Sequence, residues 1–276
     1  MTEHQRFLGV DFSGAVDAGR KIWIAEAFVV PAGDATKALA IQDVRSVAAR
    51  SGGAKARQKA MAALVDCLGQ AQDAVVGIDA PFSLPVECLG QQPNWMDWLA
   101  AFPQRYATAE AFQASIRAAC HGREPRRACD RRAKTPFSPI NLRLYRQTYH
   151  MLRDVLHPLV VGGRAAAVPF MPPTAGQVVL AETCPASFLK ANGLARPYKG
   201  GSKAHSRARE DLVNHLESMN ILVSPGQSEV MRKNSDGDAL DAVICAASLF
   251  LCAQADPTGW AAPKGPVDRI EGRVYF

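Results

Sequence analysis

Residues 7–14 read FLGVDFSG, an apolar run that closes with Gly-x-Asp. Residues 74–81 repeat this pattern as AVVGIDAP. Short apolar runs that are bounded by glycine or proline predict buried strands. Each of these strands would end in a carboxylate, Asp11 in the first and Asp79 in the second. The two segments therefore predict a sheet that carries acidic side chains at the ends of core strands.

Further acids stand at the ends of later elements. Residues 235–242 read SDGDALDA and open a very apolar stretch, which predicts a helix over 238–253. Asp238 and Asp241 are three residues apart, so they share one face of that helix. The apolar strand predicted at 177–182 also ends in an acid, Glu182, and Pro185 is expected in the first turn of the helix that follows. Carboxylates gathered in this way favour a site for a hard metal ion.

Composition narrows the class of protein. The chain has 276 residues, of which 48% are hydrophobic, enough for a substantial core. The net charge of +6 and the pI of about 9.0 favour a polyanionic partner. Residues 1–6 contain no apolar signal segment, and the longest uncharged apolar stretch, 242–253, is too short to cross a bilayer. We expect a cytoplasmic protein with no membrane segment.

The sequence lacks the motifs of several common metal-binding, disulfide and nucleotide-binding sites. The seven cysteines are scattered without a C-x-x-C pair, so neither a disulfide framework nor a zinc site is predicted. Cys245 and Cys252 are expected to fill a helix interior. A calcium loop that starts at Asn234 would need glycine where Ala239 stands, so an EF-hand is rejected. The chain also lacks a Walker-type lysine motif, G-x-G-x-x-G and H-E-x-x-H.

The order of the expected elements indicates an α/β fold. The pattern predicts strands at 21–30 and 39–47 after the first strand, then a helix at 55–68 and the strand that ends in Asp79. The region 83–175 is too long for a simple crossover and reads as a mainly helical insertion lobe within one domain, 1–276. Its helices are expected at 94–102, 108–120 and 141–156, with Thr108 and Asn141 as N-caps. A further helix is expected at 203–219, and residues 269–276 are expected to form an edge strand or a docked tail.

This order resembles the ribonuclease H-like superfamily, with a mixed sheet flanked by helices and the insertion between the fourth and fifth strands. The motifs GVDFSGA (9–15), GIDAPF (77–82), ETCPAS (182–187) and DALDA (238–242) look like those of domain-of-unknown-function family 429, a predicted nuclease family. The resemblance implies that Asp11, Asp79 and Asp241 are catalytic. It also implies that metal ligands come from Asp11, Asp79, Glu182, Asp238 and Asp241.

A metal-dependent nuclease is therefore the leading expectation. Phosphodiester hydrolysis needs an acidified water and a neutralised leaving oxyanion, and two Mg²⁺ or Mn²⁺ ions about 4 Å apart supply both. Two alternatives remain open. One is an actin-like or sugar-kinase-like phosphotransferase, in which the turn at Ser13 and Gly14 contacts phosphate. The other is a non-catalytic nucleic-acid-binding or protein-binding module on the same scaffold.

Basic segments supply candidate contacts to a nucleic-acid substrate. Residues 123–134 contain six basic residues and two acids, and a second basic group begins at Lys199. Arginine binds phosphate oxygens in pairs, which suits such a role. The candidate substrate-binding residues are Ser13, Arg126, Arg127, Arg131, Lys199 and Lys203. Five aromatic residues in the lobe could stack on bases, but their helical spacing favours the core instead: Trp95, Trp98, Tyr106, Tyr145 and Tyr149.

Overall fold

The computed structural model describes residues 5–33, 36–90 and 94–276. Within these ranges the chain forms a seven-stranded mixed sheet in the order β5-β6-β4-β1-β2-β3-β7. β2 runs antiparallel to β1 and β3, whereas the remaining neighbouring pairs are parallel. The strands are β1 (Arg6–Asp11), β2 (Trp23–Pro31), β3 (Lys37–Ser46), β4 (Ala74–Asp79), β5 (Ala165–Val168), β6 (Val178–Glu182) and β7 (Ile221–Leu222). The expected α/β class is confirmed.

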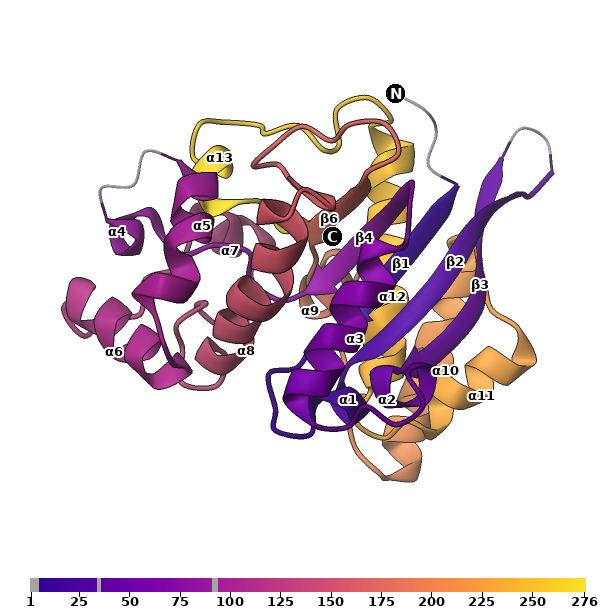
Figure 1. Cartoon of the computed structure of the whole chain (residues 1–276). Coiled ribbons are helices and arrows are strands. Elements are labelled where there is room, and N and C mark those ends of the chain that lie inside the picture. Colours follow the sequence, from indigo (N-terminus) through magenta and orange to yellow (C-terminus); the bar gives the residue numbers. More distant parts are fainter. Residues whose placement is uncertain (1–4, 34–35, 91–93) are drawn as a thin grey trace.

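Helices cover both faces of the sheet (Figure 1). Alternate residues of β1 point to opposite faces, because side chains alternate along a strand. Leu8 and Val10 join a core with α3 (Arg57–Gly69) and the π-helix η1 (Met151–Val161), whereas Phe7 joins a second core beneath α12 (Asp238–Ala255). The second core also includes residues of α9 (Pro185–Ala191), α10 (Lys203–Ser218) and α11 (Pro225–Lys233).

Helix α12 packs unusually close to the sheet. A Cβ atom on Gly9 would lie 1.8 Å from the carbonyl oxygen of Ala242, and one on Gly77 would lie 2.6 Å from that of Cys245. Both glycines are therefore needed so that the helix backbone can reach β1 and β4. This explains the glycine in each Gly-x-Asp segment. By length and composition, α12 could also cross a membrane. However, 72% of the helix is buried inside the protein, as in a core helix.

Shorter helices occur in the segments that connect these elements. They are α1 (Ala18–Lys21), α2 (Val47–Arg50), α4 (Val86–Leu89), α5 (Trp95–Arg105), α6 (Ala109–Ala119), α7 (Ala128–Ala133), α8 (Tyr145–His150) and α13 (Asp268–Glu271). Figure 1 shows α4 to α8 gathered beside the sheet. α1 lies between β1 and β2 and was not predicted.

The region 83–175 differs from the sequence-based expectation in two ways. Its last part forms β5, which pairs with β6, so the strand that ends in Glu182 is the sixth along the chain rather than the fifth. Thr108 caps α6 as predicted, but the helix expected from Asn141 begins at Tyr145. The Asn141 side chain instead accepts a hydrogen bond from the amide of Arg143, which forms a local turn before the helix. The five aromatic residues are buried, as helical spacing favoured.

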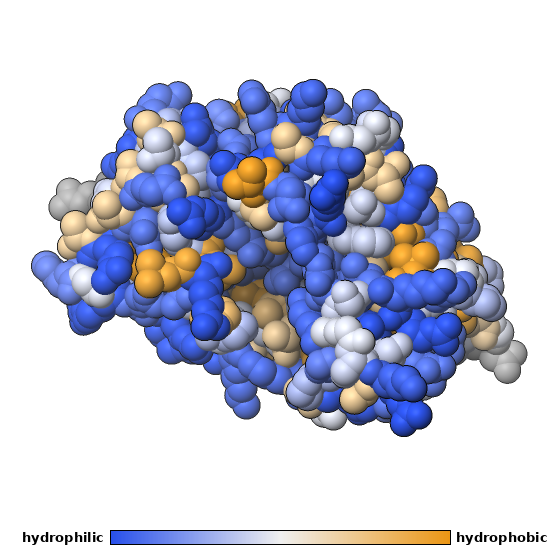
Figure 2. All heavy atoms as spheres, turned by 90° about the horizontal axis from the view of Figure 1, so that it is seen from below, coloured by the Kyte–Doolittle hydropathy of each residue, from blue (hydrophilic) through white to orange (hydrophobic). Residues whose placement is uncertain are grey.

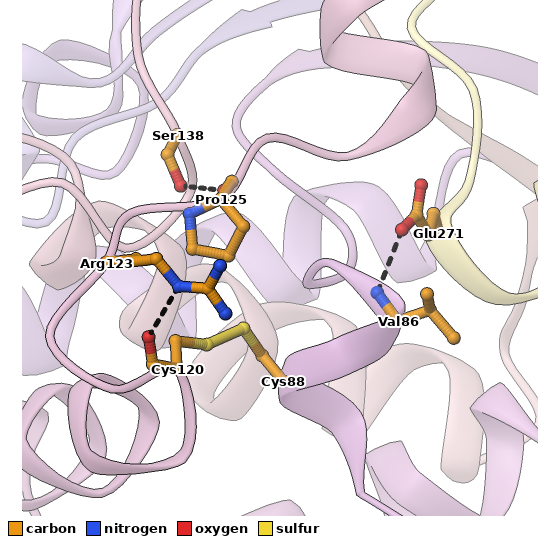
Figure 3. Close-up of a disulfide and its surroundings, with 7 residues drawn as sticks. All are labelled: Val86, Cys88, Cys120, Arg123, Pro125, Ser138 and Glu271. Atoms are coloured by element: carbon orange, nitrogen blue, oxygen red, sulfur yellow. Dashed lines mark hydrogen bonds between the residues drawn. A yellow bond between two sulfur atoms is a disulfide. The ribbon is translucent and has the colours of Figure 1, made fainter.

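One cysteine pair corrects the expectation that no disulfide is present. Cys88 at the end of α4 and Cys120 after α6 form a disulfide with a Cα–Cα distance of 6.1 Å (Figure 3). The two residues are 32 positions apart, and only the packing of α4 beside α6 brings them together. Cys245 is buried in α12 as expected, while Cys252 is partly exposed.

The C-terminal residues form a docked tail, one of the two predicted outcomes. The amide of Tyr275 donates to the carbonyl oxygen of Glu182 over 2.9 Å, and Tyr275 makes an isolated bridge with Thr183. Residues 1–4, which entered the prediction that no signal segment is present, lie outside the described residues.

Candidate active site

Asp11 and Asp79 lie side by side at the carboxyl ends of two central strands of the sheet. Each is the last residue of its strand, and the two are register partners between parallel β1 and β4. Because side chains alternate along a strand, Asp11 points to the same face as Gly9, and Asp79 to the same face as Gly77. That is the face on which α12 packs. The strand register therefore directs both carboxylates toward the start of α12.

Helix α12 supplies two more acids. Gly237 takes a left-handed conformation before the helix, and Asp238 and Asp241 occupy its first turn. The side chain of Asp241 is buried, with 2% of its surface exposed, whereas Asp238 is half-buried. Negative charge in the first turn suits the helix macrodipole, but a buried carboxylate also needs specific partners.

The four carboxylates share one electrostatic environment. Burial raises the pKa of Asp11 well above its usual value, and the charges of Asp241 and Asp79 raise it further. Burial and the charge of Asp241 raise the pKa of Asp79 to about 7. Burial also raises the pKa of Asp238 to about 6, against the opposing charge of Lys199. The site thus holds more negative charge than its neighbours neutralise.

Two consecutive residues outside the sheet pair with Asp241. The Tyr198 hydroxyl donates to Oδ1 over 2.5 Å, and Lys199 Nζ lies 2.6 Å from Oδ2. Burial lowers the pKa of Lys199, but the charges of Asp241 and Asp11 outweigh this effect and raise the pKa above its ordinary value. The Lys199 side chain remains 52% exposed. The sequence pattern singled out Lys199 within a basic segment, but nothing in it indicated Tyr198.

A pocket of about 220 Å³ adjoins these acids. Its lining includes Asp79, Tyr198, Lys199 and Asp241, the ion pair of Arg127 and Glu182, and the apolar residues Phe137 and Leu144. Gln147 also lines it and donates to the main-chain oxygen of Asp79 over 2.6 Å. The face of the molecule seen in Figure 2 is hollowed near its centre and has a largely hydrophilic rim. The pocket can take a small group next to the carboxylates.

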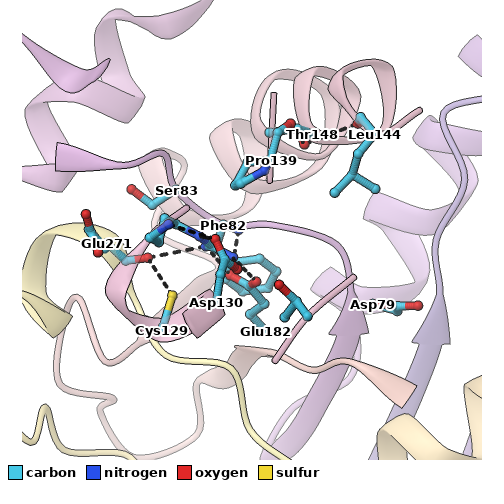
Figure 4. A network of polar contacts seen from close by, with 12 residues as sticks. Asp79, Phe82, Ser83, Cys129, Asp130, Pro139, Leu144, Thr148, Glu182 and Glu271 are labelled. Carbon is cyan, nitrogen blue, oxygen red and sulfur yellow. Dashed lines mark hydrogen bonds and ion pairs between the residues drawn. The ribbon is translucent and has the colours of Figure 1, made fainter. Parts of the chain in front are cut away.

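Glu182 belongs to a buried ion-pair network that borders the same pocket as Asp79 and Asp241. Its carboxylate pairs with both terminal nitrogens of Arg127, with Nη1–Oε2 at 2.7 Å, and accepts from the Phe82 amide over 2.9 Å. Arg127 also binds Asp130, with Nη2–Oδ1 at 2.7 Å, and the main-chain oxygen of Glu271. Figure 4 shows this cluster beside the end of β4, where Asp79 stands apart from it. Glu182 and Arg127 thus hold each other in a buried network, and both line the pocket beside Asp79. Their roles in metal and substrate binding stay predictions.

The remaining candidates for substrate contacts are placed as follows. Ser13 Oγ accepts from the Ala15 amide over 3.3 Å, and a Cβ on Gly14 would lie 2.8 Å from the carbonyl oxygen of Arg146. The turn after β1 is thus packed against α8. Arg126, Arg131 and Lys203 are exposed, the last as the first residue of α10.

The carboxylate oxygens of this site are suitable ligands for a hard cation, but the described side chains do not surround a metal position in this structure. Among the residues that the structure describes, no group of three or more histidine, cysteine or acidic side chains is arranged to hold a metal ion. The charges of Asp241 and Asp79 nevertheless act on Asp11, and carboxylate oxygens are the ligands that Mg²⁺ and Mn²⁺ prefer. One of the Asp241 oxygens is held by Lys199. A metal ion bound to Asp241 would therefore compete with this ammonium.

The raised pKa of Asp79 predicts an unusual pH dependence of stability. A carboxyl whose pKa is higher in the folded state binds more protons there, so stability falls as pH rises from about 4 to about 7. With a chelator present, Asp79→Asn is expected to raise the free energy of unfolding by about 1–2 kcal/mol at pH 8 and by little at pH 4. Urea denaturation at the two pH values measures this, with Asp17→Asn at an exposed position as the control. A loss of stability at pH 8 would contradict the charge repulsion.

Comparison with known proteins gives one match. A family model described as "Protein of unknown function (DUF429)" matches residues 16–249. The matched range includes Asp79, Lys199, Asp238 and Asp241 and begins shortly after Asp11. No curated protein and no solved structure matched the chain significantly.

Proposed function

Because the chain belongs to the DUF429 family of proteins of unknown function, its activity has to be inferred from its own side chains, and we propose that it is a metal-dependent nuclease. The observation that carries the proposal is the convergence of Asp11, Asp79 and Asp241, three carboxylates from β1, β4 and α12 whose charges act on one another. A buried acid with a purely structural role normally has a cation of its own. Here the charge of one ammonium, that of Lys199, acts on several carboxylates.

The arrangement of the elements supports a ribonuclease H-like fold as part of the proposal. Strands β1 to β3 form consecutive antiparallel pairs, α3 follows, and β4 returns beside β1. The acids then stand on the first strand, the fourth strand and a late helix, which is the distribution expected of that superfamily. Fold alone does not specify a reaction, so the proposal depends on the site.

The residues take the following roles in this proposal. Asp11, Asp79 and Asp241 would hold Mg²⁺ or Mn²⁺, with Asp238 beside Asp241 in the first turn of α12. When bound, such ions acidify a water molecule and neutralise charge on the leaving oxygen. The half-exposed side chain of Lys199 lines the pocket, where its ammonium would contact a phosphate oxygen.

The substrate would be a nucleic-acid strand that crosses the hollowed face. Arg126, Arg131 and Lys203 are exposed and remain candidates to contact its backbone. The chain has no recognisable base-reading motif, so cleavage is expected to be nonspecific or directed by nucleic-acid structure. The phosphotransferase alternative gains no support, because the turn at Ser13 and Gly14 packs against the backbone of α8.

A cleavage assay tests the proposal. End-labelled single-stranded and duplex DNA and RNA are incubated with the purified protein and either Mg²⁺ or Mn²⁺. We expect cleavage that EDTA abolishes and that Asp11→Asn lowers at least about a hundredfold, because one charged ligand is lost at the reacting centre. Asp17→Asn, in the exposed loop after β1, is the matched control.

Two results would count against the nuclease. One is a wild-type protein that leaves all four substrates intact with both metals. The other is cleavage that persists at the wild-type rate in folded Asp11→Asn protein, which would identify a contaminating enzyme. Circular dichroism spectra that match the wild type establish that each variant is folded.

A further inference from the structure

Lys199 is the cation at the centre of the acidic site. Its Nζ lies 2.6 Å from Asp241 Oδ2, and its charge acts on Asp11, Asp79 and Asp238 as well. The two ends of this ion pair differ in exposure, since the Asp241 side chain is 2% exposed and the Lys199 side chain is 52% exposed. The carboxylate is therefore fixed in the core, whereas the ammonium can leave toward solvent.

The backbone on either side of Lys199 is held in place. The Tyr198 hydroxyl donates to Asp241, and the Tyr198 carbonyl oxygen accepts from Arg209 over 2.6 Å. The amide of Gly200 donates to the carbonyl oxygen of Ser235 over 2.7 Å, close to the start of α12. Because the main chain is anchored, removal of the ammonium from Asp241 requires only rotation of the lysine side chain.

A divalent ion and the ammonium would compete for the same oxygen. Asp241 Oδ1 is occupied by Tyr198 and Oδ2 by Lys199. A metal ion that binds Asp241 together with Asp11 or Asp79 would lie beside these two partners, and Lys199 is the one that is charged and exposed. Two positive charges a few ångströms apart also repel each other.

We propose that Lys199 is a built-in counter-cation that occupies the acidic site without metal and is displaced when a divalent ion binds. This proposal rests on the proposed function, because it requires the aspartates to form the metal site. Lys199 would keep the carboxylates folded together and lower the affinity for metal. Once displaced, its ammonium would point into the pocket, where a substrate phosphate can bind it. Metal binding would thereby prepare the site for its substrate.

Calorimetric titration of Mn²⁺ into metal-free protein tests the competition. Three proteins are compared: wild type, Lys199→Gln and the control Lys233→Gln. Lys233 is exposed and pairs with Glu229 within α11, so its replacement removes the same charge away from the site. We expect Lys199→Gln to bind Mn²⁺ about tenfold more tightly than the other two proteins, because the competing charge is gone.

Each outcome of the titration has a distinct meaning. Equal affinity in all three proteins, or weaker binding by Lys199→Gln, would overturn the role of Lys199 but leave the metal site in place. Failure of all three proteins to bind Mn²⁺ would overturn both the counter-cation and the proposed metal site. A second readout uses the wild-type chain: an amine-reactive reagent followed by peptide mass analysis should label Lys199 faster with Mn²⁺ than without it. An unchanged labelling rate in protein that has bound Mn²⁺ would overturn the displacement.

Discussion

Arg127→Met is expected to lower the free energy of unfolding by about 3–5 kcal/mol, the largest loss of stability among the changes considered. The Arg127 side chain is 1% exposed and is the shared partner of Glu182 and Asp130, whose side chains are also buried. Methionine fills much of the space but leaves both carboxylates without their cation. Breaking a buried ion pair by removal of one partner costs more than the pair itself contributes.

Urea denaturation at pH 7 measures the effect of Arg127→Met. Arg131→Met is the matched control, because Arg131 lies in the same helix, α7, and is exposed. The double variant Arg127→Met/Glu182→Gln should recover part of the loss, since one of the two unpaired charges is then removed. A denaturation midpoint for Arg127→Met equal to that of Arg131→Met would show that the network contributes little.

Gly9→Ala is expected to destabilise the protein by about 3 kcal/mol through overpacking. The new Cβ would lie 1.8 Å from the carbonyl oxygen of Ala242 and 2.5 Å from the amide nitrogen of Ala246, and both are backbone atoms of α12. The helix has to move away from β1, because no side-chain rotation relieves such a contact. Since Asp241 adjoins Ala242, the same shift would move a carboxylate of the proposed metal site.

The measurement for Gly9→Ala combines urea denaturation with Mn²⁺ titration. Gly201→Ala is the control, because a Cβ there meets no atom within 4 Å. We expect Gly9→Ala to lose stability and to bind Mn²⁺ more weakly than the control. Wild-type stability in Gly9→Ala would contradict the close approach of α12 to the sheet.

Local sequence pattern was enough to predict the main strands and the longer helices. The apolar runs before Asp11 and Asp79 form β1 and β4, and the helices predicted at 203–219 and 238–253 correspond closely to α10 and α12. These elements are recognisable because burial imposes a period on the residues within each one. The acids at their ends could be singled out for the same reason, since a charge that ends a buried run is conspicuous.

Packing decided which partner each charged residue has. Glu182 ends a buried strand just as Asp79 does, yet it pairs with Arg127, which is 55 residues away along the chain. Asp241 pairs with Tyr198 and Lys199 from the loop before α10, and Cys88 pairs with Cys120 across two helices. None of these pairings produces a periodic pattern in the sequence, because each depends on how distant segments are placed in space.

The sequence by itself therefore determined where the main strands and the longer helices lie and which acids end the strands, but not β5 or β7. The tertiary structure alone decided that the charges of three aspartates act on one another and that Lys199 pairs with Asp241. The physical reason is the distance along the chain over which each effect acts. Hydrophobic periodicity acts between near neighbours in the chain, whereas the partners of a buried charge are set by contacts between residues far apart in sequence.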